Sequence, residues 1–224
     1  MTESANELEP AVRWDGKWCW SVKIDPTPWN RYVLFRRAVR IHDQPQHALV
    51  RVSADARYAL YVNGRRIHFG PARSFPQYQS YDTIDLADHL RPGVNTICAV
   101  CHQYGTSTFQ NVYRAASGFV LDGVIATPTE QIAVHTPEGW MCRDARGWRQ
   151  NVARLSIQMG FQEHYDADAD PPDWMGATFE PKAEDGWKAP VVIGPAGVHP
   201  WLSMEPRNAP LLAFEPHDFV AIAG

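Results

Sequence analysis

The chain has 224 residues, of which 45% are apolar and 21% are charged, and its net charge is -4 with a pI near 6.1. This length accommodates one large β-domain or one domain with an appended segment. The slightly acidic balance, with no block of Lys and Arg interleaved with aromatic residues, argues against nucleic acid as a partner. No stretch of the sequence approaches a membrane span, so we expect no membrane partner either.

The first residues, 1–13, are polar and acidic and lack the basic and apolar regions of a signal peptide. We predict a flexible leader there, and without an export signal the sequence favours a cytoplasmic location. Residues 14–24 carry Trp14, Trp18 and Trp20 and end at the breaker Asp-Pro-Thr-Pro. This pattern is compatible with an edge strand before the breaker.

Residues 31–123 are typical of consecutive strands, because apolar side chains recur at every second position. Val50 and Val52, for example, lie on the same face of a strand, and we expect that face to be buried. Asn63 and Gly64 tolerate the positive φ values of a type I′ turn, which predicts a hairpin that returns through residues 65–70. Asp85 is expected to cap a short turn or helix before the next strand, 94–100.

Short strand-like segments at 131–135 and 140–143 are expected to extend the same sheets. Residues 144–190 are richer in Asp, Trp and Pro, which predicts a loop-rich region rather than a separate domain. We expect this region to pack on the sheets through Trp148, Phe161, Trp174, Phe179 and Trp187. The predicted fold is therefore all-β, a jelly-roll β-sandwich with a loop-rich C-terminal extension over residues 14–205. Residues 206–224 carry three prolines and are expected to be a connecting segment.

The four cysteines include one Cys-x-x-Cys, formed by Cys98 and Cys101. Both lie in a predicted strand, where residues three apart point to opposite faces and cannot easily share a zinc ion. A second pair with matching spacing is missing. We therefore predict buried free thiols and no metal, in keeping with a reducing compartment.

Three stretches in order resemble the N-terminal non-catalytic region of bacterial α-L-rhamnosidases and related glycoside hydrolases. They are Ala54–Gly64, Tyr81–Asn95 and Glu163–Ala167, followed by Trp174 and Trp187. In that family the region is a galactose-binding-type jelly roll, and the catalytic (α/α)-barrel lies C-terminal to it. The resemblance implies a non-catalytic accessory domain that supports a catalytic domain missing from this chain, with residues 206–224 as the linker toward it.

The polar loop at 102–114 interrupts two predicted strands, and it is the first candidate for carbohydrate binding, since recognition groups concentrate on such rim loops. Its aromatic faces and hydrogen-bonding groups are Tyr104, Gln110, Asn111, Tyr113 and Arg114. An ordinary long connection that covers the core edge is an equal alternative. A second candidate rim segment, 70–81, offers Arg73, Gln77 and Tyr78, although a proline-broken crossover is the favoured interpretation there.

Glu163 and Asp166 are further candidates for carbohydrate contacts, and carboxylates also suit Ca²⁺. The favoured alternative is a structural network in which Asp166 caps backbone N–H groups. The acidic residues from Asp166 onward match the first ligands of an EF-hand, but Pro171 and Ala177 stand where that motif requires Gly and Glu. An EF-hand is therefore excluded, and we expect no cofactor, with a looser Ca²⁺ site as the alternative.

No catalytic residue is predicted, because no serine lies in a Gly-x-Ser-x-Gly context and no cysteine has an identifiable His partner. The sequence is also compatible with two functions other than an accessory domain. The first is a free-standing carbohydrate-binding module, for which a rhamnose-containing glycan or galactose would be the partner. The second is an independent metal-dependent enzyme that uses Glu163, His164 and His199, residues that are scattered among predicted loops.

Overall fold

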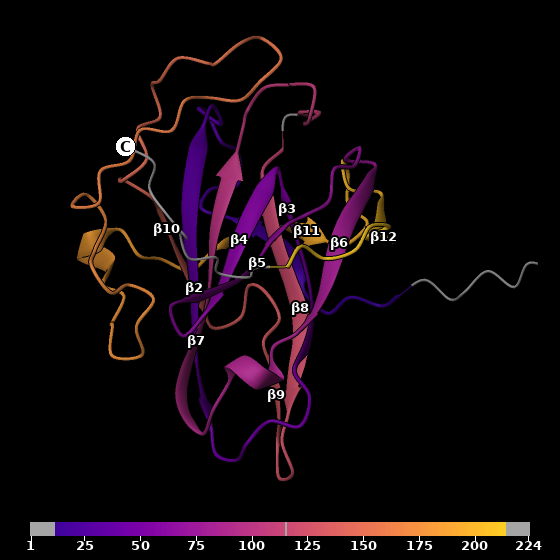
Figure 1. Cartoon of the computed structure of the whole chain (residues 1–224), viewed down its shortest axis with the longest axis vertical. Helices are drawn as coiled ribbons and strands as arrows, with labels where there is room; N and C mark the ends of the chain where they lie inside the picture. Colours follow the sequence, from indigo (N-terminus) through magenta and orange to yellow (C-terminus); the bar gives the residue numbers. More distant parts are fainter. Residues whose placement is uncertain (1–11, 115, 214–224) are drawn as a thin grey trace, which may run out of the picture.

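The computed structural model describes residues 12–114 and 116–213, and within them two β-sheets pack face to face as a sandwich (Figure 1). Sheet I has the strand order β11-β1-β8-β3-β6-β12, with β9 beside β8, and sheet II has the order β10-β2-β7-β4-β5. All pairs are antiparallel except β12 with β6. The predicted all-β sandwich is thus confirmed.

The strands of sheet I are β1 (Lys17–Trp20), β3 (Leu49–Asp55), β6 (Tyr78–Asp85), β8 (Gly118–Ala126), β9 (Gln131–Ala133), β11 (Val191–Pro195) and β12 (Ser203–Pro206). Those of sheet II are β2 (Arg31–Ile41), β4 (Arg57–Val62), β5 (Arg65–Gly70), β7 (Gly93–Gln103) and β10 (Trp140–Asp144). Two short 3₁₀ helices, η1 (Ala87–His89) and η2 (Ala183–Asp185), lie in the connections.

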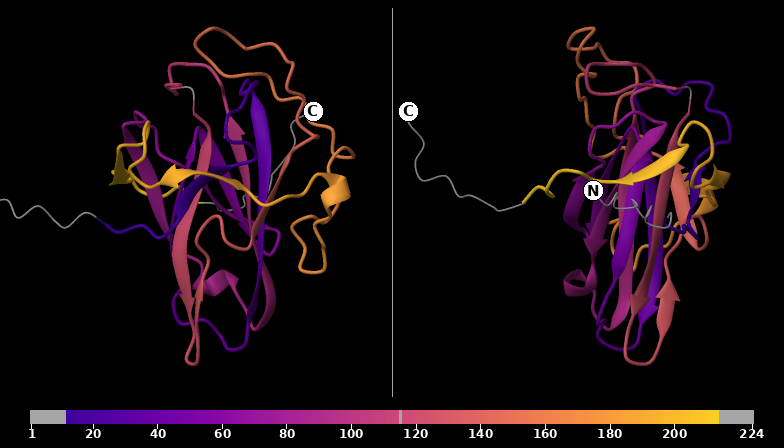
Figure 2. Two further views of the ribbon diagram at one scale, coloured as in Figure 1. Left: turned by 180° about the vertical axis from the view of Figure 1, so that it is seen from behind. Right: turned by 90° about the vertical axis from the view of Figure 1, so that its right-hand side faces the viewer.

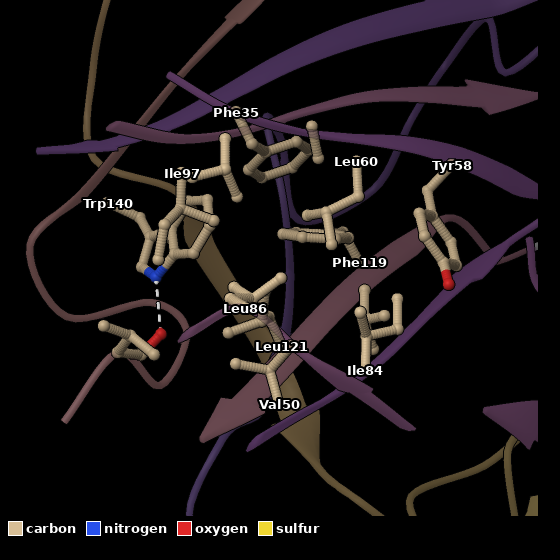
Figure 3. Close-up of a cluster of buried hydrophobic side chains, with 14 of the residues drawn as sticks. Phe35, Val50, Tyr58, Leu60, Ile84, Leu86, Ile97, Phe119, Leu121 and Trp140 are labelled. Carbon is tan, nitrogen blue, oxygen red and sulfur yellow. Dashed lines mark hydrogen bonds between the residues drawn. The ribbon is translucent and has the colours of Figure 1, made fainter. Parts of the chain in front are cut away.

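The core lies between the two sheets and is built by the alternation read in the sequence (Figure 3). Phe35 of sheet II packs on Phe119 of sheet I with ring centroids 4.8 Å apart, and Leu60 is likewise fully buried. Trp140 closes one side, where its indole N–H donates to the carbonyl of Val134 at 3.0 Å. Full burial of such side chains contributes about 1.5–3 kcal/mol each, so this layer holds the sheets together.

Local turn chemistry follows the sequence. Asn63 and Gly64 have φ values of 50° and 79°, as a type I′ turn between β4 and β5 requires. Asp85 ends β6, and its carboxylate accepts the backbone N–H of Ala87 at 3.0 Å at the start of η1. The predicted hairpin is confirmed, whereas the N-cap of η1 is Leu86, and Asp85 accepts a hydrogen bond from η1 one position before the cap.

The strand β7 shows why the Cys-x-x-Cys pair cannot bind one ion. Cys101 faces the core between the sheets, whereas Cys98 lies on the outer face of sheet II. All four cysteines are free and buried, as predicted. Burial raises the pKa of each thiol, to about 12 for Cys98 and Cys142, so the reactive thiolate is suppressed.

The edges of sheet I differ from the prediction. β1 is not an edge strand, because it lies between β8 and β11, with Trp18 opposite Gly194 and Cys19 opposite Phe119. The edge position next to β1 is taken by β11 and the opposite edge by β12. Both strands come from residues 191–206, so this late segment borders the sheet on both sides (Figure 2).

The loop-rich region covers the outer face of sheet II, along one side of the sandwich in Figures 1 and 2. Trp174 and Trp187 are buried there against Leu34 and Val100, with Trp148 and Phe179 packed around them, as predicted. The fifth predicted aromatic anchor, Phe161, instead contacts Trp29, with ring centroids 4.7 Å apart.

Of the predicted leader, only Val12 and Arg13 lie within the described residues, and of the predicted connection only 206–213 do. Arg207 in the latter segment forms an ion pair with the fully buried Asp82, which Tyr58 also contacts through its hydroxyl. Burial raises the pKa of Asp82, but hydrogen bonds from His68, Arg207 and Tyr58 outweigh it, so the pKa is lowered. In the part of the chain that the structure describes, no helix has the length and apolar character needed to cross a membrane.

Candidate functional site

The loops at one end of the sandwich bring the two predicted rim segments together. Residues 70–79 and the tip of the 102–114 loop flank the corner where β3 ends and β4 begins, and they enclose a pocket of about 250 Å³. We call it the Asp55 pocket. It is lined by Ala54, Asp55, Ala56, Arg57, Pro71, Ala72, Arg73, Ser74, Pro76, Gln79, Gln110 and Asn111.

Asp55 lies on the inner wall of this pocket and is 3% exposed. Its carboxylate accepts the indole N–H of Trp201 at 3.0 Å and, more weakly, the amide of Gln103 at 3.4 Å. Burial raises the pKa of Asp55 to about 6, and these two hydrogen bonds only partly offset the effect. The pocket therefore holds a carboxyl group that changes charge near neutral pH.

Two arginines stand at the mouth of the pocket. Arg57 is exposed, donates to the side-chain oxygen of Gln110 at 2.9 Å, and lies over the ring of Tyr104 at 5.0 Å from its centroid. Arg73 is also exposed and has no hydrogen bond or ion pair with any described residue. The first guanidinium is thus held in place while the second is available to a ligand.

Four residues of the 102–114 loop were predicted to act together with Tyr104, and the structure divides them between two pockets. Gln110 and Asn111 line the Asp55 pocket, whereas Tyr113 and Arg114 line another one. Tyr104 lines neither pocket, since it is only 7% exposed and lies under Arg57. It supports the site from below rather than offering a stacking face.

The second pocket has a volume of about 380 Å³ and lies between the β1–β2 connection, the start of β8 and the β11–β12 turn. We call it the Asp25 pocket. It is lined by Trp20, Val22, Lys23, Ile24, Asp25, Tyr113, Arg114, Ala116, Ser117, Ile193, His199 and Pro200. Burial raises the pKa of Tyr113, and the carboxylates of Asp25 and Asp55 raise it further.

Glu163 and Asp166 are exposed on the loop-rich region and line neither pocket. Glu163 accepts the indole N–H of Trp148 at 2.9 Å, and Trp148 stacks on Tyr32 with centroids 4.7 Å apart. Asp166 accepts the backbone N–H of Asp168 at 3.2 Å. Both residues make structural contacts, and their assignment to a carbohydrate site stays a prediction.

The buried carboxylate of the acidic loop is Asp170. It accepts backbone N–H groups of Arg146 and Gly147 at 2.9 and 2.8 Å and pairs with Arg143 at 3.3 Å. In residues 12–114 and 116–213, no three side chains of His, Cys, Asp or Glu converge as metal ligands would. His199 lines the Asp25 pocket, whereas His164 contacts Gln162 at 3.3 Å in the exposed loop.

Sequence reasoning missed Asp25, Asp55 and Arg57. Asp55 ends β3 and Arg57 begins β4, and two charged residues close together within the predicted strand run are the signal that points to this corner. Asp25 lies in the predicted breaker after β1, and a polar residue in a turn gives no further sign of a binding role.

No protein-family model and no curated protein matches the chain. Among solved structures, a GH78 family rhamnosidase of Bacillus sp. GL1 is similar over 90% of this chain and 20% of its own, with 32% identity and a TM-score of 0.77. An α-L-rhamnosidase from Aspergillus terreus matches 80% of this chain and 21% of its own, with 18% identity and a TM-score of 0.63.

A lectin from Pleurotus ostreatus, in complex with GalNAc, matches 83% of this chain and 44% of its own, with 22% identity and a TM-score of 0.53. At this identity, the lectin and the Aspergillus enzyme show the fold alone. The resemblance to α-L-rhamnosidases read in the sequence is confirmed, and the chain spans about one fifth of the length of the rhamnosidases it matches.

Proposed function

We propose that this chain is a non-catalytic accessory domain of an α-L-rhamnosidase-like glycoside hydrolase and that the Asp55 pocket binds carbohydrate. The observation that carries the proposal is the convergence of Arg73 with Gln110 and Asn111 in one pocket, because these residues come from rim segments far apart in the sequence. The similarity to one fifth of a rhamnosidase supports the accessory role.

The chemistry of the pocket suits sugar hydroxyls, which both donate and accept hydrogen bonds. Arg73 supplies donors only, Asp55 supplies mainly acceptors, and the amide groups of Gln110 and Asn111 supply both. In the proposed complex Arg57 acts with its guanidinium oriented by Gln110 and Tyr104, so little side-chain freedom is lost on binding. Most of the lining is polar, which favours a hydroxylated ligand over an apolar one.

The proposed division of labour leaves hydrolysis to the remainder of the longer protein. The purified chain is therefore expected to give no turnover of an aryl α-L-rhamnoside, and robust turnover that copurifies with the chain would contradict this part of the proposal. Support of the catalytic domain is tested in the parent enzyme, where removal of this domain is expected to lower the midpoint of thermal inactivation.

Carbohydrate binding is tested by calorimetric titration of the chain with L-rhamnose and with D-galactose. Arg73→Ala and Gln110→Ala are each expected to weaken binding about tenfold, the loss of one good hydrogen-bonded contact. Arg91→Ala is the matched control, because Arg91 is also exposed but lies close to η1 and outside the pocket lining. Absence of binding to both sugars, or equal affinities of the Arg73 and Arg91 variants, would overturn the assignment.

A further inference from the structure

The Asp25 pocket carries an inference beyond the proposed function, because it is separate from the Asp55 pocket. Its volume of about 380 Å³ falls within the range of about 300–1,000 Å³ that ligand pockets occupy. Val22, Ile24, Ile193 and Pro200 give it apolar walls, and Trp20 and Tyr113 add aromatic ones. A few polar groups are placed between these walls, as in a small-molecule site.

Two of those polar groups are buried and have no hydrogen-bond partner among the described residues. Trp20 is fully buried and leaves its indole Nε1 unpaired. The side chain of Asp25 is 5% exposed and leaves Oδ2 unpaired. A buried donor or acceptor without a partner costs folding free energy, so a donor and an acceptor left unpaired at one pocket call for an explanation.

Unpaired indoles alone would not make a site. Trp18 and Trp187 also leave Nε1 unpaired, but neither lines the Asp25 pocket or the Asp55 pocket. What distinguishes the Asp25 pocket is that an unpaired donor and an unpaired acceptor belong to two residues that line the same cavity, which is large enough for a ligand.

The charge of Asp25 is balanced by Arg31, which it shares with Asp144, and by Lys23 and Arg114, which also line the pocket. Its Oδ1 accepts from the guanidinium of Arg31 at 2.7 Å and from the backbone N–H of Thr27 at 3.0 Å, which fixes the carboxylate in one orientation. The nearby Lys23 donates to the backbone carbonyls of Val192 and Ile193. The remaining oxygen of Asp25 therefore calls for a neutral donor such as a hydroxyl rather than for a cation.

We infer that the Asp25 pocket is a second binding site, whose ligand is a neutral polyhydroxylated ring the size of one monosaccharide. One hydroxyl donates to Oδ2 of Asp25, another hydroxyl oxygen accepts from Nε1 of Trp20, and the C–H face of the ring lies against Tyr113 and Ile193. Tyr113, which sequence analysis assigned to carbohydrate binding, acts here rather than in the Asp55 pocket.

The test uses indole N–H resonances of the ¹⁵N-labelled chain as reporters, because Trp20 lines the Asp25 pocket and the indole of Trp201 is hydrogen-bonded to a residue that lines the Asp55 pocket. Trp20 reports on the Asp25 pocket, and Trp201, which donates to Asp55, reports on the other one. Both signals are assigned from the variants Trp20→Phe and Trp201→Phe. On titration with millimolar L-rhamnose and, separately, D-galactose, at least one sugar is expected to shift the Trp20 signal to saturation.

Asp25→Asn replaces the acceptor Oδ2 with a donor and is expected to weaken the binding reported by Trp20 at least tenfold. Arg31 keeps its second partner, Asp144, at 2.8 Å, so the variant retains part of the local ion-pair network. Trp20→Phe removes the donor without removing any hydrogen bond of the free protein, and the affinity measured through the Tyr113 backbone signal is expected to fall about as much. Trp18→Phe is the matched control.

The inference is overturned if neither sugar moves the Trp20 signal, or if Asp25→Asn and Trp20→Phe bind as tightly as Trp18→Phe. Should Asp25→Asn fail to fold, Trp20→Phe alone decides the question. Shifts confined to Trp201 would support the Asp55 pocket and refute the second site, so the two proposals fail separately.

Discussion

The clearest quantitative expectation concerns Asp55 and the dependence of stability on pH. The native pKa of Asp55 is raised to about 6, whereas the ordinary value that it regains on unfolding is 3.8. Between these values the native protein holds a proton that the unfolded chain has released. Protonated Asp55 therefore contributes fully to the free energy of unfolding below about pH 4, and this contribution is lost as the pH rises through 6.

The size of this effect follows from the shift. A difference of about two pKa units corresponds to about 3 kcal/mol at 1.4 kcal/mol per unit. Asn is nearly isosteric and does not titrate, so Asp55→Asn removes the pH dependence from this site. We expect the stability of the wild-type chain relative to the variant to fall by about 3 kcal/mol between pH 3 and pH 7.

The assay is urea denaturation followed by tryptophan fluorescence at several pH values, on both chains. Taking the difference cancels the titration of the nine histidines and of the other carboxyls. Asp88→Asn is the control, since Asp88 is exposed in η1. Parallel stability profiles for the wild-type chain and Asp55→Asn would refute the reasoning, and a difference of opposite sign would show that the hydrogen bonds to Asp55 outweigh its burial.

Three other expectations follow from packing and charge. Arg207→Ala removes the arginine that pairs with the buried carboxylate of Asp82 and leaves it with His68 and Tyr58. The free energy of unfolding is expected to fall by about 3 kcal/mol in urea titrations, and a loss below about 1 kcal/mol would argue against the pair. Gly118→Ala puts a methyl group 2.7 Å from the stacked rings of Trp18 and Trp201 and is expected to lower the free energy of unfolding by about 1–3 kcal/mol. The near-ultraviolet circular dichroism should change as well, and an unchanged spectrum would contradict the packing. Because all four thiols are buried with raised pKa values, a thiol reagent should label none in the native chain and all four in denaturant, and rapid native labelling would show that a strand opens.

The parts of the fold that were predictable are those specified by residues close in sequence. Alternation defined the strands from residue 31 to 123, and Asn63 with Gly64 defined their hairpin. The strand β11 was missed because its two valines are both partly exposed and show no alternation. Its structure comes from backbone pairing with β1, about 170 residues earlier, and no local pattern encodes such a partner.

In the candidate site, too, the features set by neighbouring residues were predictable and those set by long-range packing were not. Gln110 and Asn111 were found because a polar loop interrupts two strong strands, which is visible in the sequence. Their meeting with Arg73 depends on how the sandwich closes, and the hydrogen bond from Trp201 to Asp55 joins residues 146 positions apart. Tyr104 was assigned a stacking role from its residue type alone, and only the packing of Arg57 over its ring shows that the face is covered.

The placement of β11 and β12 on the two edges of sheet I has a consequence for biosynthesis. Trp18, Cys19 and Trp20 of β1 are among the first described residues to leave the ribosome, yet one neighbouring strand consists of residues 191–195. At about 5–20 residues per second, β1 waits on the order of ten seconds or longer for that partner. During this time its indoles and unpaired backbone groups are open to chaperones and to neighbouring nascent chains, so slower translation would prolong the period in which this domain is prone to aggregate.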